Sequence, residues 1–479
     1  MNAEELTKKV KERERCRLGM RRIRDERRTN LKIAKEIALQ EERESRAKEK
    51  RDKDAARKRR KRDLFADAYD QQRRLLTVDH RAVELRRQYQ DHIKGGLVSY
   101  LAKLSKLALW ILESAEPGRN WHGSCCTDVS QEEADYFLLT QESHNRWLRD
   151  GNGMKLVVVR DPKYNETRKD RVSITGLWKN ILRLDKATSG KMRIDVQDFS
   201  GPEPKVKKIL VSDAYHRWKM SVGVVSDSNP PMNLLNLASQ SVPRLAGIEK
   251  HMTFLDDVIL DAEDKRALGP GKKYTSATDI KGCRWLRILG QAGAISGWHR
   301  DNLGPFTYVT LEDGDDEPRD TNKQSDETVV KLWAVARIDH LTEDQQEAAL
   351  ADFAEERELW IPKDPVRIIV IALVRGDTLI MPPGTIHAPI TLTDCLLSGG
   401  MCMHKKFVSE SMVVWKYLVD NPHCTNENKP QQTFEVVSCI RDRVCSDPEA
   451  HGITTRDALQ EFEDNCLKVM KKRKGRRLG

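Results

Sequence analysis

Two glycine-framed motifs within residues 285–404 constrain the fold more than any other feature of this sequence. In the first motif, Gly293 precedes His299 and Asp301, which are separated by a single residue. Side chains two residues apart on a β-strand lie on the same face, so this spacing predicts that the imidazole and the carboxylate converge. A partially buried pair of this kind needs partners, because burying an unpaired polar group is costly.

The second motif adds a third group of the same chemistry. Gly376 and the turn 382–384 bracket a short apolar run, and His387 follows on the next extended segment. Two histidines and one carboxylate that converge from two strands form the facial arrangement that binds non-haem Fe(II) and leaves coordination positions open. We therefore predict His299, Asp301 and His387 as metal ligands and catalytic residues.

The spacing of these motifs resembles the two motifs of cupins. The words WHRDN, TYV, KLW and GDTLIMPPGTIHAP, with the paired glycines at 399–400, resemble JmjC-domain proteins, in particular the fungal type. The matching segments cover about a quarter of the chain. The resemblance implies a double-stranded β-helix (jelly-roll) barrel with its core at 283–404. It also implies an oxygenase that uses Fe(II), with 2-oxoglutarate and O2 as cosubstrates.

The resemblance further implies a lysine that binds the distal carboxylate of 2-oxoglutarate. In JmjC domains this lysine usually lies on the strand that follows the His-x-Asp motif, shortly before an aromatic residue, and Lys331 fits that position. The assignment requires strands at 307–312 and 331–338 to pair across a turn at Gly314, with the polar, acidic segment 315–330 as an insert. A surface lysine at the start of a strand is the alternative.

Other cosubstrate contacts are less completely assigned. Ser296, three residues before the first ligand, matches a position where the family often places a hydroxyl on the same carboxylate. Val309 stands where many members carry Tyr or Asn, and Thr391 stands where many cupins carry Asn. One contact of the cosubstrate therefore has no predicted residue. If Lys331 does not bind the distal carboxylate, Arg300 and Arg337 are the next basic candidates for that role.

The positive charge of the chain is concentrated at its two ends. Residues 1–62 contain 25 Lys and Arg against 13 Asp and Glu, and residues 468–479 contain seven basic residues and no acidic one. The body between them has 52 basic and 61 acidic residues, although the whole chain carries a net charge of +10. The ends predict contact with a polyanion such as DNA or a nucleosome. A solvated charged helix or a disordered arm is the alternative for the first segment, whose leucines do not sustain a zipper repeat.

The composition changes along the chain predict a mixed α/β protein with four regions. These are a basic helical or disordered arm (1–95), a small α/β region (96–169), the JmjC catalytic region (170–405) and a helical C-terminal region with a basic tail (406–479). Periodicity predicts helices at 97–112, 341–359, 409–421 and 458–472, strands at 154–160, 192–199, 283–289 and 366–374, and a strand followed by a helix at 207–220.

The cysteines and the apolar segments indicate an intracellular protein. Ten cysteines without a C-x-x-C pair suit reduced thiols. The sequence contains no run of eighteen apolar residues, so we expect no membrane span, and the N-terminus is too charged for a signal peptide. A zinc site is a weaker alternative at two places where the spacings fit no tight zinc motif: Trp121, His122, Cys125 and Cys126, and Cys402, His404, His423, Cys424, Cys439 and Cys445.

The resemblance makes a nuclear histone lysine demethylase, acting in chromatin on histone tails, the leading functional hypothesis. Hydroxylation of a protein side chain is the nearest alternative, and RNA hydroxylation follows it. A non-catalytic chromatin or nucleic-acid binder that uses the barrel as a scaffold is the alternative from a different class.

Overall fold

The chain forms two units, residues 1–68 and 69–479, and every described residue belongs to the second. The computed structural model describes residues 80–94, 99–121, 131–151, 153–161, 172–198, 205–220, 225–226, 230–238, 244–267, 280, 284–312, 329–425 and 432–471. No helix within these ranges is long and apolar enough to cross a membrane.

One of the two sheets has four strands. Its order is β1 (Glu116–Pro117), β11 (Arg367–Val374), β10 (Val329–Arg337) and β13 (Ile386–Thr391). All neighbours are antiparallel except β1 and β11. The predicted strand at 366–374 is confirmed as β11, whose apolar run is buried from residue 368 onward. Isolated bridges at residues 295 and 299 add one more extended segment beside β13.

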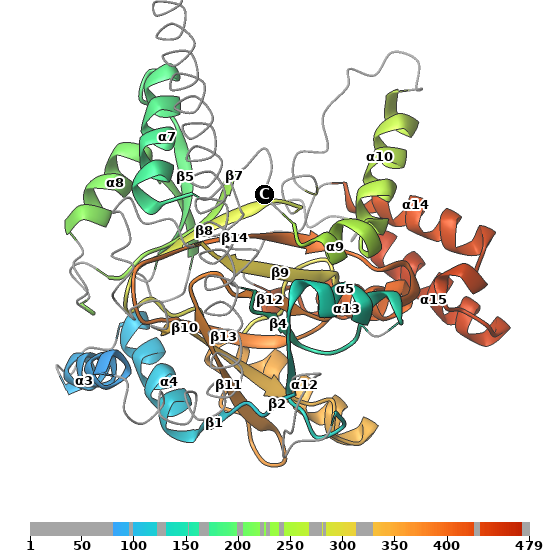
Figure 1. Ribbon diagram of the computed structural model, residues 1–479, viewed down its shortest axis with the longest axis horizontal. Coiled ribbons are helices and arrows are strands. Elements are labelled where there is room, and N and C mark those ends of the chain that lie inside the picture. Colours follow the sequence, from blue (N-terminus) through green and yellow to red (C-terminus); the bar gives the residue numbers. More distant parts are fainter. Residues whose placement is uncertain are drawn as a thin grey trace, which may run out of the picture. The chain divides into compact units, whose positions relative to one another are not determined.

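The second sheet is larger and lies above the first in Figure 1. The strands at its centre, β12, β9, β14 and β8, come from the predicted barrel core, and strands from earlier segments extend it on both sides. In order across the sheet, the strands are β2 (Asn120–Trp121), β3 (Tyr136–Leu139), β4 (Val157–Val159), β12 (Thr378–Met381), β9 (Phe306–Leu311), β14 (Cys395–Cys402), β8 (Leu286–Gly290), β7 (Asn233–Ala238), β5 (Arg193–Asp198) and β6 (Lys205–Leu210).

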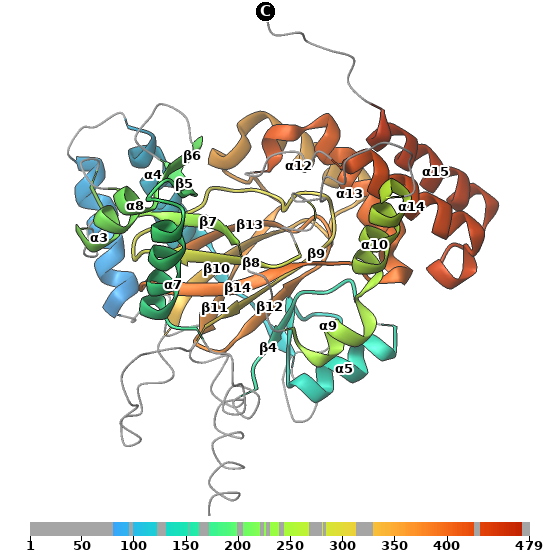
Figure 2. The same ribbon diagram turned by 90° about the horizontal axis from the view of Figure 1, so that it is seen from above.

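Helices cover the outer faces of these sheets in separate groups (Figures 1 and 2). The α-helices are α3 (His80–Lys94), α4 (Tyr100–Ser114), α5 (Gln141–Arg149), α7 (Ile174–Ala187), α8 (Val211–Met220), α9 (Ala246–His251), α10 (Phe254–Ala267), α12 (Glu343–Glu356), α13 (Val408–Asp420), α14 (Thr433–Ser446) and α15 (Arg456–Met470). Short 3-10 turns lie at Arg357–Leu359, Lys405–Phe407, Pro422–Cys424 and Glu449–His451. The helices expected at 97–112, 341–359, 409–421 and 458–472 are confirmed, and α14 was not predicted.

The predicted hairpin between strands 307–312 and 331–338 is wrong. Both strands form, as β9 and β10, but β9 pairs with β12 and β14 in the large sheet. β10 pairs with β11 and β13 in the small sheet. Consecutive strands are neighbours in most folds, and this regularity underlay the prediction. Here the chain changes sheets between the two strands, so residues of β10 face residues of β9 across the interior.

The end of the predicted N-terminal arm belongs to the folded unit. Residues 1–79 lie outside the described ranges, whereas 80–94 form α3, which contacts α4. Leu85 and Tyr89, four residues apart on one face of this helix, are buried in the core that covers the small sheet. The Tyr89 hydroxyl donates a hydrogen bond to the carbonyl of Gly293 at 2.9 Å. The charged composition of the arm concealed this apolar stripe.

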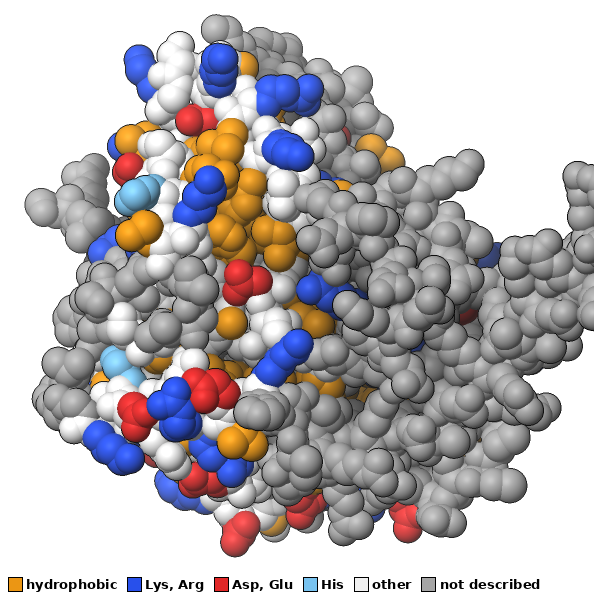
Figure 3. All heavy atoms as spheres, turned by 60° about the vertical axis from the view of Figure 1, so that its left-hand side comes forward, with side chains coloured by type: hydrophobic (Ala, Val, Ile, Leu, Met, Phe, Trp, Pro, Cys, Tyr) orange, Lys and Arg blue, Asp and Glu red, His pale blue; other side chains and the backbone are white. Residues whose placement is uncertain are grey.

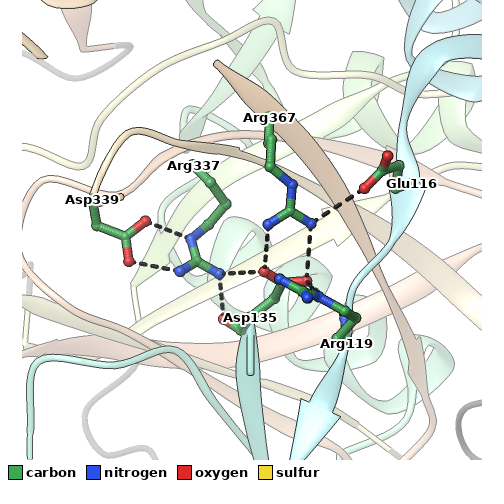
Figure 4. Close-up of polar contacts among 6 residues, drawn as sticks. All are labelled: Glu116, Arg119, Asp135, Arg337, Asp339 and Arg367. Carbon is green, nitrogen blue, oxygen red and sulfur yellow. Dashed lines mark hydrogen bonds and ion pairs between the residues drawn. The ribbon is translucent and has the colours of Figure 1, made fainter. Parts of the chain in front are cut away.

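A buried carboxylate joins the small α/β region to the four-stranded sheet. Asp135, 2% exposed, accepts hydrogen bonds from Arg337 and Arg367, at the paired ends of β10 and β11, and from Arg119 (Figure 4). Glu116 and Asp339 contact the outer sides of Arg367 and Arg337. The strands from residues 116–159 are therefore fixed to both sheets by pairing and by this ion network.

We expect the substitution Asp135→Asn to lower the free energy of unfolding by about 3 kcal/mol, because it leaves three partly buried guanidinium groups without their common buried anion. Asp339→Asn is the matched control. The Asp339 side chain is half-exposed on the same arginine, and its loss should cost no more than about 1 kcal/mol. Urea unfolding measures both variants. Equal losses would show that the buried carboxylate contributes no more than the exposed one.

Candidate metal centre

Two histidines from different segments lie opposite each other at the centre of the candidate site. The N–H of His299 donates to the carbonyl of His387, and the N–H of His387 donates to the carbonyl of His299, both at 3.0 Å. Residues paired in this way on antiparallel segments direct their side chains to the same face. The centroids of the two imidazole rings are 4.2 Å apart.

The carboxylate of Asp301 completes the group. One oxygen of Asp301 is 3.7 Å from Nε2 of His387, and one ligand atom from each of the three residues lies within 4.8 Å of the others. The two imidazoles are buried and the Asp301 side chain is 20% exposed, so the group is more open on the carboxylate side. The three residues predicted from the sequence are thus brought together at distances suited to a single metal ion.

Backbone carbonyl groups orient both imidazoles. Nδ1 of His299 lies 2.8 Å from the carbonyl of Gly297, and Nδ1 of His387 lies 3.1 Å from the carbonyl of Thr385. An Nδ1–H that donates to a carbonyl leaves the Nε2 lone pair of the same ring for a metal. The indole of Trp333 stacks on His387, at 5.3 Å between centroids and 17° between planes, and holds that ring from one side.

The surroundings keep His299 in the form that a metal requires. Burial and, to a smaller extent, the neighbouring His387 lower the pKa of His299 to about 4, although Asp301 opposes this. At neutral pH the imidazole is therefore uncharged, as a metal ligand must be.

Glycines at left-handed backbone angles shape the turns that lead into the two motifs. Gly293 has φ +84°, Gly376 has φ +87° and Gly384 has φ +78°. Only glycine adopts these angles without steric cost. The glycine frame seen in the sequence therefore reflects turns that place the ligand segments side by side.

The alternative zinc cluster in the C-terminal region does not assemble. In the described ranges, His299, Asp301 and His387 are the one group of three or more potential ligands close enough to share an ion. His404 Nδ1 instead accepts a hydrogen bond from the N–H of Lys406. Burial raises the pKa of Cys402 to about 12, which keeps its thiol protonated. His122, Cys125 and Cys126 lie outside the described residues.

The three ligands border a cavity of about 60 Å³ that lies between the two sheets. The small sheet contributes Lys331, Trp333 and Pro389 to its wall, whereas the large sheet contributes mostly apolar side chains such as Val309 and Leu397. Side chains of both sheets meet here, so the sheets face each other. Val309, which replaces the expected polar residue, forms part of the apolar wall.

Lys331 places an ammonium group inside this cavity. The residue is 3% exposed, so the alternative of a surface lysine is wrong. Lys331 lies directly across from Thr391 in the pairing of β10 with β13, and Nζ donates to the Thr391 hydroxyl at 3.0 Å. Burial lowers the pKa of Lys331. In the part of the chain that the structure describes, no carboxylate lies within ion-pair distance, so the ammonium is suited to an anionic ligand.

Polar side chains gather beside this lysine. The Asn233 amide donates to Gln197 at 3.1 Å and to the Ser296 hydroxyl at 3.3 Å, and Ser296 donates to Gln197 at 3.2 Å. The Asn233 carbonyl oxygen is buried without a hydrogen-bond partner. A Cβ on Gly290 would meet Thr391 Oγ1, Asn233 Oδ1 and Lys331 Nζ at 3.1 to 3.4 Å, so the lack of a side chain there leaves these groups a shared space.

The sequence analysis identified Ser296 and Lys331 of this cluster but missed Asn233 and Gln197. These two residues lie on β7 and β5, far in the sequence from the motifs. The one sequence signal that could have identified them is a polar residue within an apolar strand pattern. The two further basic candidates lie elsewhere: Arg337 binds Asp135 and Asp339, and the guanidinium of Arg300 is 4.6 Å from the centroid of the Tyr417 ring.

Comparison with known proteins gives partial matches. No protein-family model matches the chain. A protein of Curvularia clavata named KK-1 biosynthesis cluster protein D is 24% identical over 302 residues, which is 61% of this chain and 26% of that protein. JmjC domain-containing histone demethylation protein 1 of Cryptococcus neoformans is 26% identical over 155 residues, which is 31% of this chain and 16% of that protein. The similarity is of the JmjC type.

The matches cover a minor part of each relative. The chain spans about a quarter of the Curvularia protein and about a sixth of the Cryptococcus protein. Together with the His-Asp-His group, these relatives support a JmjC-type oxygenase family for this chain. The activity of either whole relative is a separate question.

Proposed function

We propose that this protein is an Fe(II)- and 2-oxoglutarate-dependent JmjC dioxygenase whose two facing sheets form a double-stranded β-helix. One observation carries the proposal: a His-Asp-His group and a buried ammonium without a carboxylate partner border the same cavity. A metal site alone would serve many reactions. The adjacent cation adds a place for an anionic cosubstrate.

The donor set fits iron better than a structural metal. Two imidazole nitrogens and one carboxylate occupy one face of an ion and leave the remaining positions for other ligands. His299, Asp301 and His387 would hold Fe(II), which supplies the one-electron chemistry that O2 activation needs. Structural zinc sites instead close all four positions with protein ligands.

The polar end of the cavity fits the distal carboxylate of 2-oxoglutarate. Lys331 and the hydroxyl of Thr391 provide donors there. Ser296 belongs to the same polar cluster, because its hydroxyl accepts a hydrogen bond from Asn233. Hydrogen bonds between an ammonium and a carboxylate are about twice as strong as neutral ones. We assign the carboxylate contact to Lys331, with Ser296 and Thr391 as supporting hydroxyl groups.

Histone lysine demethylation in the nucleus is the reaction that we propose first. The printed name of the Cryptococcus relative refers to histone demethylation, and the basic ends of this chain suit a chromatin polyanion. Hydroxylation of another substrate is the second candidate. The relative that matches more of this chain is named for a biosynthesis cluster, and the cavity wall opposite Lys331 is largely apolar.

Product analysis separates the two reactions. Purified protein is incubated with Fe(II), ascorbate, 2-oxoglutarate and methylated histone peptides, and peptide masses and formaldehyde are measured together. We expect loss of a methyl mass with release of formaldehyde, because a hydroxylated N-methyl group is unstable and decomposes. A stable gain of one oxygen would support a hydroxylase. Succinate formation with neither change would rule out these histone peptides as substrates.

A further inference from the structure

The far end of the large sheet carries a compact unit next to the cavity. Strands β5 and β6 form a hairpin, and α7 and α8 pack on it around a shared apolar core (Figures 1 and 2). β7 joins this unit to β8, and Gln197 of β5 accepts hydrogen bonds from Asn233 and Ser296 within the polar cluster of the cavity. We call α7, β5, β6 and α8 the hairpin unit, described over residues 172–198 and 205–220.

The hairpin unit is strongly basic within an acidic body. It contains ten Lys and Arg against four Asp and Glu, a net charge of +6. Residues 63–467, which include it, contain 52 basic and 61 acidic residues, a net charge of −9. The rest of the body therefore has a net charge of −15. A local excess of positive charge of this size attracts a polyanion within the Debye length, which shortens as the salt concentration rises.

Three of these basic residues form a stripe on α7. Lys179, Arg183 and Lys186 follow one another at four and three residues, which places them on one side of the helix, and all three are exposed. Leu177, Trp178 and Ile181 are instead buried in the core of the unit. In the described ranges, none of the three stripe residues forms an ion pair.

The nearby acidic group does not neutralise this stripe. Asp185 is 8% exposed, and its carboxylate accepts a hydrogen bond from the N–H of Met192 at 2.9 Å. Lys191, just beyond the helix, is exposed and extends the basic surface. The stripe itself is about 10 Å long, from the rise of a helix over seven residues. That length corresponds to about three base-pair steps along the axis of B-DNA.

The aromatic residues of the unit favour a duplex over a single strand. Trp178 packs against Tyr215 and Trp218, at 5.1 and 6.0 Å between ring centroids and in tilted arrangements, so these rings contact one another within the unit. Proteins that bind single strands present aromatic rings on which bases stack. Figure 3 shows the side of the molecule that carries α7 and α8, where Lys and Arg side chains surround apolar ones. The basic groups are exposed, whereas Trp178 is buried and Tyr215 and Trp218 are half-buried, so the basic groups are the more accessible to a ligand.

We infer that the hairpin unit binds the phosphate backbone of double-stranded DNA through Lys179, Arg183, Lys186 and Lys191. The contact is independent of base sequence, because lysine and arginine on phosphates position a protein without reading bases. β7, which contributes Asn233 and Leu235 to the wall of the cavity, pairs with β5 and so connects the unit to the candidate metal centre. The inference does not depend on catalysis and is tested on metal-free protein.

The experiment compares two variants of the full chain that lose the same charge. The surface variant carries Lys179→Gln, Arg183→Gln, Lys186→Gln and Lys191→Gln. The control carries Lys103→Gln, Lys106→Gln, Arg146→Gln and Arg149→Gln, four exposed residues on α4 and α5. Both variants keep the basic ends, so any binding through the ends is common to them. Fluorescence anisotropy with a 25-base-pair duplex measures Kd from low to high salt, and circular dichroism checks folding.

We expect the surface variant to bind the duplex at least about tenfold more weakly than the control near 100 mM salt. The slope of log K against log salt should fall by about 2 to 4, since each lost phosphate contact removes about 0.9. Equal affinities and slopes for the two variants would overturn the inference. Tighter binding to a single strand of the same length, or equal competition by polyglutamate, would also contradict a duplex site.

Discussion

Replacing either His299 or His387 with alanine should abolish Fe(II) binding and leave the fold intact. The unmodified protein should bind about one Fe(II) under anaerobic conditions, because the three residues form a single ligand set. Removing one imidazole leaves two protein ligands, and the other two residues lie on segments that are held by backbone pairing rather than by the metal. Iron content after desalting measures binding, and far-UV circular dichroism checks the fold.

His404→Ala is the control for the loss of a buried histidine. His404 is 6% exposed, and burial lowers its pKa to about 4, as for His299, but it lies outside the metal group. This variant should bind iron as the unmodified protein does. Unchanged iron stoichiometry in both ligand variants would contradict the assignment, whereas loss in all three would indicate general destabilisation.

The grouping of His299, Asp301 and His387 was predictable because much of its geometry is local. Asp301 is two residues from His299, and the glycine turns before each motif need backbone angles that few other residues adopt. Period-two alternation then fixes which side chains share a face. The resemblance to JmjC domains, rather than local geometry, pointed to Lys331, and it did so for a partly wrong reason, because the strand of Lys331 does not form the expected hairpin with β9.

Features that depend on contacts distant in sequence were not predictable in this way. Asn233 and Gln197 reach the cavity only because β7 and β5 extend the large sheet beyond β8. Tyr89 is buried only because α3 folds back onto the turn at Gly293. In each case the local pattern is ordinary, and tertiary packing decides the outcome. The roles of Lys331 and Ser296 toward 2-oxoglutarate stay predictions.

Replacing Lys331 with methionine should weaken 2-oxoglutarate binding and leave Fe(II) binding unchanged. The substitution keeps most of the side-chain volume and removes the charge, so it tests the ammonium rather than the packing. Hydrogen bonds to charged groups contribute about 1.5 to 3 kcal/mol, which corresponds to roughly a 10- to 100-fold rise in Kd. Calorimetric titration with 2-oxoglutarate measures this change, and iron content provides the internal control. An unchanged Kd would exclude Lys331 from the cosubstrate site.

The same substitution should stabilise the protein when no cosubstrate is bound. Burial lowers the pKa of Lys331, so the ammonium is less stable inside the cavity than in water, and its hydrogen bond to Thr391 offsets only part of that cost. Lys331→Met should therefore raise the free energy of unfolding of the ligand-free protein. It should also abolish the extra stability that added 2-oxoglutarate gives the unmodified protein. A lysine kept for structure alone would give the reverse, with lower stability in the variant and no dependence on the cosubstrate.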